Sequence, residues 1–154
     1  SEGVYNPGTH LTRFAAMPAA IMPAVVKNTA APKALIEHGK QVYATLCVTC
    51  HQPDGRGLPN IFPPLAQSDF LQADKDRVVR ALLEGLSGEI VVNGQTFNGV
   101  MPKFPLTDED IAGALSYVRT GFGNAASPIT AADVRRVRAN RIAAPDNADA
   151  SRLQ

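Results

Sequence analysis

Cys47-Val48-Thr49-Cys50-His51 is the stretch that decides the fold of this 154-residue chain. It holds the chain's two cysteines, and a histidine directly follows the second. A Cys-x-x-Cys-His string is typical of c-type haem attachment. Two thiols at this spacing can add to the two vinyl groups on one porphyrin edge, and one helical turn then brings the next imidazole under the iron. The motif predicts one covalent haem c, bound by Cys47 and Cys50, with His51 as an axial iron ligand.

Two other uses of a cysteine pair fit this sequence less well. A thioredoxin-like redox site belongs to a βαβ context, and no such unit is predicted here. A structural zinc site needs four ligands, and the chain has just two further histidines, His10 and His38. We therefore prefer haem attachment and expect both of these histidines at the surface.

The iron needs a second ligand on the face opposite His51 if the haem is to be six-coordinate. We predict Met101, because the Val100–Phe104 stretch lies in an expected loop before the helix of residues 108–120, and the following proline stiffens that loop. Met17 and Met22 also precede prolines, but they lie in an irregular arm. These two methionines, a histidine or an open site are the alternatives. His/Met ligation raises the reduction potential relative to two histidines.

The sequence around the motif predicts helices joined by an irregular loop. Residues 33–51 repeat apolar side chains at three- and four-residue steps, which indicates a helix that ends at the haem motif. Residues 52–72 carry the glycines and prolines of a loop. Asp74 is a candidate N-cap for a second helix that ends near Gly85.

A hairpin and a further helix are predicted next. Residues 90–92 and 95–97 flank Asn93-Gly94, which is a strong signal for a two-residue hairpin turn. Thr107-Asp108-Glu109-Asp110 resembles a capping box at the start of a helix over residues 108–120, although Asp replaces the usual Glu or Gln in the fourth place.

Both ends of the chain are expected to be extensions of one domain over residues 33–123. Residues 1–32 are rich in Ala and Pro and predict an arm or linker. The apolar stretch over residues 14–26 is too short to span a bilayer and is interrupted by prolines, so no transmembrane segment is predicted. Any secretion signal is expected to have been removed already.

Residues 124–154 predict a polar tail with one short helix that begins near Thr130. This helix carries four arginines at positions 135, 136, 138 and 141. We interpret them as a solvated face, and the alternative is a basic contact for an acidic partner. The formal net charge of +1 gives no indication of nucleic-acid binding or of a strongly charged membrane surface.

Several of these residues together resemble the class I cytochrome c family. The resemblance covers roughly residues 33–123 and is carried by Gly39, Tyr43, Cys47–His51, Pro63-Pro64-Leu65, Met101-Pro102 and Leu115–Val118. It implies an all-α class I cytochrome c fold with a small β-hairpin around one haem. It also implies that the first and last family helices cross at Gly39, with Tyr43 and Tyr117 nearby. In this family a proline carbonyl accepts the ring N–H of the axial histidine. Pro63 matches that proline best, and Pro64 is the alternative.

Residues 57–70 and 86–102 are similar, more narrowly, to haem c domains that are tethered to copper nitrite reductases or serve as their partners. The resemblance implies a periplasmic one-electron carrier with redox partner proteins, among them a copper nitrite reductase. A cytochrome c subunit of a periplasmic dehydrogenase or terminal oxidase is the alternative. A haem enzyme or gas sensor with an open sixth position is an alternative of another class. The docking surface is expected at the haem edge, near Val48, Gln52, Pro53, Pro102 and Phe104.

Overall fold

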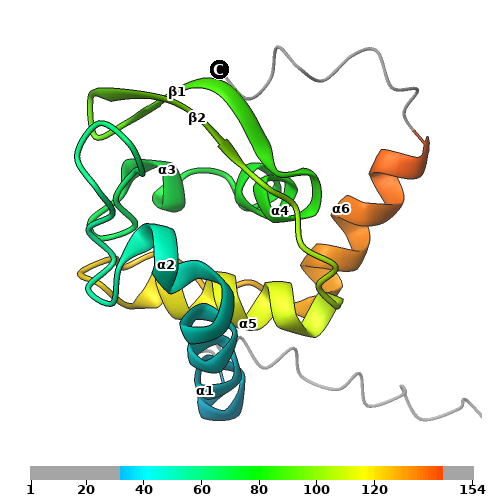
Figure 1. Ribbon diagram of the computed structural model, residues 1–154. Coiled ribbons are helices and arrows are strands. Elements are labelled where there is room, and N and C mark those ends of the chain that lie inside the picture. Colours follow the sequence, from blue (N-terminus) through cyan, green and yellow to red (C-terminus); the bar gives the residue numbers. More distant parts are fainter. Residues whose placement is uncertain (1–31, 144–154) are drawn as a thin grey trace, which may run out of the picture.

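The computed structural model describes residues 32–143 and is mostly helical, with one small antiparallel sheet (Figure 1). This agrees with the predicted architecture. The elements are α1 (Lys33–Val42), the π-helical segment η1 (Tyr43–Cys47), α2 (Val48–His51), α3 (Asp69–Gln72), α4 (Lys75–Glu84), β1 (Leu86–Val92), β2 (Gln95–Met101), α5 (Asp108–Thr120) and α6 (Ala131–Ala143). The short helix α3 lies within the stretch that was predicted to be a loop. Most of the N-terminal arm lies outside the described residues.

Helices α1 and α5 cross at a pair of glycines. A Cβ atom built on Gly39 would lie 1.9 Å from the carbonyl oxygen of Gly113, so the two backbones are in direct contact. Next to the crossing, His38 Nε2 lies 2.7 Å from Asp110 Oδ1. The rings of Tyr43 and Tyr117 pack with centroids 5.5 Å apart. The close approach that the resemblance implied at Gly39 is therefore present.

The crossing leads to a prediction about Gly39→Ala. Alanine normally stabilises the interior of a helix by about 0.5–1 kcal/mol relative to glycine. Here the new methyl group would overlap the Gly113 carbonyl, and forced overpacking typically costs about 1–3 kcal/mol. We expect a net loss in the free energy of unfolding, measured by urea denaturation. Lys40→Ala, at an exposed position of the same helix, is the control. Equal stability of the two variants would contradict the close approach.

Both predicted helix caps are present. The side chain of Asp74 accepts hydrogen bonds from the backbone N–H groups of Asp76 (2.7 Å) and Arg77 (3.3 Å) at the start of α4. At the start of α5, the backbone N–H of Asp110 donates to Thr107 Oγ1 at 3.1 Å, and the N–H of Thr107 donates to Asp110 Oδ2 at 3.0 Å. The shorter aspartate thus completes the capping box.

The hairpin is longer than the sequence indicated. Asn93 and Gly94 have φ values of 51° and 75°, which a two-residue turn of type I′ requires. From this turn the strands pair without interruption as far as Leu86 and Met101. Met101 therefore ends a strand, and the prediction that it lies in a loop was wrong. The two strands continue to pair beyond Ile90 and Phe97, and this additional pairing places Met101 in β2.

Helix α6 packs against α4 and α5 (Figure 1). Ile129, Val134 and Val137 bury their side chains in the shared core. We expected the arginines of α6 to form a solvated face. They are partly exposed, but they also have partners. They pair with carboxylates of the two neighbouring helices, in the contacts Arg135–Glu109, Arg136–Asp76, Arg138–Asp108 and Arg141–Glu84. These partners are distant in sequence, so the pattern of α6 alone does not indicate them.

Two carboxylates predict a loss of stability in acid: Asp76, which pairs with Arg136, and Asp110 of the capping box. Hydrogen bonding from Arg136 lowers the pKa of Asp76, and hydrogen bonds from Thr107 lower the pKa of Asp110. A group whose pKa is depressed by folding stabilises the protein above its unfolded pKa, about 3.9 for Asp, and this stability is lost as the pH falls through the folded value. We expect the urea concentration at the unfolding midpoint to decrease once the pH is lowered below about 4. Asp76→Asn should make this fall shallower, whereas Glu37→Gln, at an exposed position, should not. An unchanged slope in Asp76→Asn would contradict the assignment.

Candidate haem site

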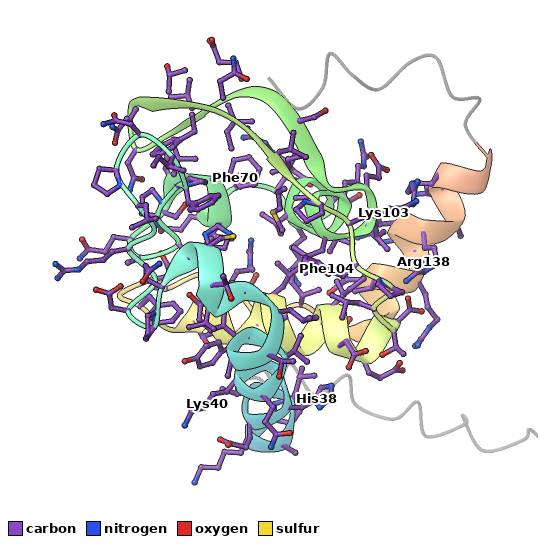
Figure 2. All side chains as sticks on the ribbon, in the orientation of Figure 1. His38, Lys40, Phe70, Lys103, Phe104 and Arg138 are labelled. Atoms are coloured by element: carbon purple, nitrogen blue, oxygen red, sulfur yellow. The ribbon has the colours of Figure 1, made fainter. Side chains whose placement is uncertain are left out.

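One cavity brings together the residues that the sequence singled out. Its lining includes Cys47, Cys50, His51, Pro63 and Met101, which come from η1, α2, the following loop and the end of β2. The remaining walls are mainly apolar side chains from α3, α4, α5 and the hairpin. Phe70 of α3 and Phe104, which follows β2, are among them (Figure 2).

Cys47 and Cys50 are half-buried and unpaired at the wall of this cavity. The helix passes through a π-helical turn over η1, which ends at Cys47, and α2 then carries Cys50 and His51. Burial, followed by the nearby Cys50, raises the pKa of the Cys47 thiol to about 11. Two thiols that have not formed a disulfide are therefore available on the cavity wall.

The imidazole of His51 is held in one orientation. Its Nδ1–H donates to the carbonyl of Pro63 at 3.0 Å, so Pro63 is the proline in contact. The ring is buried, and burial lowers the pKa of His51, an effect that the hydrogen bond to Pro63 opposes. A neutral imidazole whose Nδ1 carries the proton leaves Nε2 free to bind a metal.

Two residues that the sequence analysis did not assign to the site support this geometry. Gly57 has φ +65°, and its N–H donates to the His51 carbonyl at 3.0 Å. A Cβ at Gly57 would lie 2.2 Å from the carbonyl oxygen of Phe62, so the loop folds back tightly there and carries Pro63 toward His51. The hydroxyl of Tyr43 donates to the carbonyl of Gln52 at 2.6 Å and fixes the residue after His51. The Gly-x-Gly spacing at Gly55 and Gly57 was the available signal.

Met101 lines the cavity and is half-buried. Among the described residues it is the methionine at this site, since Met17 and Met22 lie outside them, as does His10. The side chain of His38 is 45% exposed and pairs with Asp110 away from the cavity lining. Within the described residues, Met101 is therefore the candidate second ligand that lies at the cavity, and His38 does not.

A family comparison agrees with this geometry. The model of the cytochrome c family matches residues 36–122, which include the whole of the motif and Met101. The chain belongs to the cytochrome c family. This cytochrome c is 39% identical over 114 residues to cytochrome c-552 of Thermus thermophilus, across 68% of its own length and 86% of the relative's.

Longer relatives match the same region. The cytochrome c subunit of the quinone alcohol dehydrogenase of Gluconobacter oxydans is 32% identical over 104 residues, which are 65% of this chain and 22% of that subunit. The fructose dehydrogenase cytochrome subunit of Gluconobacter japonicus is 33% identical over 112 residues, which are 66% of this chain and 22% of the subunit. This cytochrome c thus spans about a fifth of the length of either dehydrogenase subunit.

The cofactor of this cytochrome c is haem c, and the cavity suits it. The walls are apolar, both thiols are unpaired, and His51 has a free ring nitrogen. Among the described residues, Arg77 Nε is the buried side-chain nitrogen that has no hydrogen-bond partner. The Arg77 guanidinium lies 4.2 Å from the centre of the Phe70 ring, which forms part of the cavity wall.

Proposed function

We propose that this electron-transfer protein is a one-electron carrier whose haem is attached through Cys47 and Cys50 and whose iron is bound by His51 and Met101. One observation carries the proposal. Segments that are fifty or more residues apart in sequence bring both thiols, the imidazole and the thioether to the same apolar cavity. Bound haem supplies a one-electron change at iron.

The residues of the site act by holding the iron's surroundings constant. Pro63 fixes the ring of His51, and the strand pairing of Leu86 with Met101 fixes the backbone that carries the thioether. The apolar walls formed by residues such as Phe97 and Leu115 exclude water. Two protein ligands and a dry pocket favour electron transfer over substrate chemistry. The position of Met101 therefore speaks against a haem enzyme or gas sensor with an open sixth position.

The partner is an oxidoreductase that exchanges single electrons with the haem. The dehydrogenase cytochrome subunits among the relatives support a dehydrogenase. The similarity of residues 57–70 and 86–102 to haem domains of copper nitrite reductase systems supports a copper reductase. We place the protein in the periplasm because c-type haem attachment belongs to exported chains. In the part of the chain that the structure describes, no helix has the length and apolar character needed to cross a membrane.

The docking surface is the apolar rim of the cavity. Pro102 is exposed, Phe104 is half-buried, and both line the cavity. Ile61 and Val100 also line it, and they are 59% and 74% exposed. Such a rim suits the small, transient contacts of redox encounters. The net charge of +1 gives little long-range steering, so contact area dominates the association.

This surface predicts the effect of Phe104→Glu. A carboxylate on the rim must be desolvated when a partner docks, so we expect electron transfer to slow by about tenfold or more, equivalent to roughly 1.4 kcal/mol. Val91→Glu is the matched control, because Val91 is 52% exposed on the hairpin but does not line the cavity. Raising the salt concentration moderately should change the wild-type rate by only about a few-fold. Stopped-flow oxidation or reduction with the partner measures the rates of both variants and the salt dependence of the wild type.

The same assay tests the function. The reduced protein alone should be stable to nitrite, and it should become oxidised in step with nitrite consumption when the cognate copper reductase is added. A dehydrogenase partner would instead reduce the oxidised protein when its own substrate is present. A steep dependence on salt, or equal slowing by both glutamate variants, would contradict docking at this rim. Failure to exchange electrons with either class of enzyme would contradict the proposed carrier.

A further inference from the structure

Two glycines face each other across the hairpin above the cavity. Gly88 of β1 pairs directly with Gly99 of β2, and both line the cavity. Side chains alternate along a strand, so position 99 shares a face with Phe97, which is buried, and with Met101. The inward face of β2 thus reads Phe97, Gly99, Met101, and a side chain is missing at its centre.

The two glycines differ in what the backbone requires. Gly88 has φ +88°, a conformation that L side chains rarely adopt, so glycine is needed there for the backbone alone. Gly99 is not in that region. A Cβ built on Gly99 would meet no protein atom closer than the carbonyl oxygen of Ile61, at 3.9 Å. Neither backbone strain nor protein packing therefore requires glycine at this position.

A glycine inside a strand is costly, since it lowers strand stability and has no side chain to pack. A position of this kind often marks a place where a ligand approaches the backbone closely. The space that a side chain would occupy at Gly99 opens into the cavity that holds Cys50, His51 and Met101. The missing side chain thus leaves room for an occupant that the polypeptide itself does not supply.

We propose that Gly99 is a positioning residue for the haem, on the basis of the proposed function. Its lack of a side chain lets β2 lie directly against the cofactor, and this sets how closely Met101, two residues further on the same face, approaches the iron. A methyl group at position 99 would hold the strand away from the cofactor and weaken the bond between the Met101 thioether and the iron. A branched side chain would weaken it more.

The test compares Gly99→Ala and Gly99→Val with Asn98→Ala in the holoprotein. Asn98 is exposed on the same strand and does not line the cavity, which makes it the matched control. In Gly99→Ala we expect a weaker near-infrared methionine–iron band, a lower reduction potential and at least tenfold tighter carbon monoxide binding to the ferrous protein. In Gly99→Val the band should be lost. Asn98→Ala should match the wild type.

The outcomes separate this proposal from the ligand assignment on which it rests. In one outcome, Met101→Ala loses the band, while both Gly99 variants keep the band, exclude carbon monoxide and retain the wild-type potential. The proposed role of Gly99 is then wrong, and the assignment of Met101 as the ligand stands. If Met101→Ala keeps the band, the ligand assignment is wrong, and the role of Gly99 falls with it. A purely structural role for Gly99 would lower the urea midpoint without changing the band in the absence of urea, and that result would also overturn the proposal.

Discussion

Protein that carries Cys47→Ala and Cys50→Ala and is made without haem should be largely unfolded. Many of the buried residues line the cavity, among them Leu71, Val78 and Leu115, so the core is completed by the cofactor. With the cavity empty, these side chains lose their packing partners and exchange burial for water, which removes the largest favourable contribution to folding. The expected loss is comparable to the whole stability of a domain, about 5–15 kcal/mol.

Far-ultraviolet circular dichroism and thermal melting measure this effect. The double variant should show weak helical signal and no cooperative transition. Thr49→Ala is the control, because Thr49 is exposed between the two cysteines and leaves both thiols in place, so haem attachment should proceed and the melt should stay cooperative. A cooperative, native-like melt of the haem-free double variant would show that the polypeptide forms its core unaided.

Met101→Ala should produce the largest change in the haem itself. Loss of a neutral thioether, which favours ferrous iron, should lower the reduction potential by more than about 0.1 V, a fraction of the roughly 0.8 V over which axial ligands set haem potentials. The vacated position should bind carbon monoxide in the ferrous state and cyanide in the ferric state. Near-infrared spectroscopy should show that the methionine–iron band is lost. Optical titration measures the binding of carbon monoxide and cyanide, and potentiometry measures the reduction potential.

The other two methionines provide the control for this assignment. Met17→Ala and Met22→Ala should leave the haem spectrum and the potential unchanged. If either arm variant loses the near-infrared band while Met101→Ala keeps it, the thioether comes from the N-terminal arm. Six-coordinate spectra without a methionine band in the wild type would point to a nitrogen ligand instead.

Features that are encoded within a few neighbouring residues could be predicted from the sequence alone. The spacing of Cys47, Cys50 and His51 specifies the attachment chemistry. Asp74 and Thr107 begin their helices because the groups that they cap lie two or three residues away. Asn93-Gly94 specifies the turn because a type I′ turn requires positive φ at both positions, which Asn and Gly adopt readily. In each case the interacting groups are local, so the pattern carries its own physical cause.

Other features depend on groups that meet only when the chain is compact. Pattern alone left Pro63 and Pro64 as alternatives, and the tight loop at Gly57 decides that Pro63 contacts His51. The arginines of α6 find carboxylates on α4 and α5, up to sixty residues away.

Gly39 and Gly99 show the same division between local and long-range causes. In sequence each is a glycine within a regular element. In the structure, a methyl group at Gly39 would strike the backbone of another helix, whereas one at Gly99 would point into the haem cavity. Local spacing and periodicity were enough to predict the cofactor and the main helices around it, but not α3 or the full length of the hairpin. The tertiary structure decided which carbonyl, carboxylate or open space each side chain faces, because those distances exist only between segments that folding brings together.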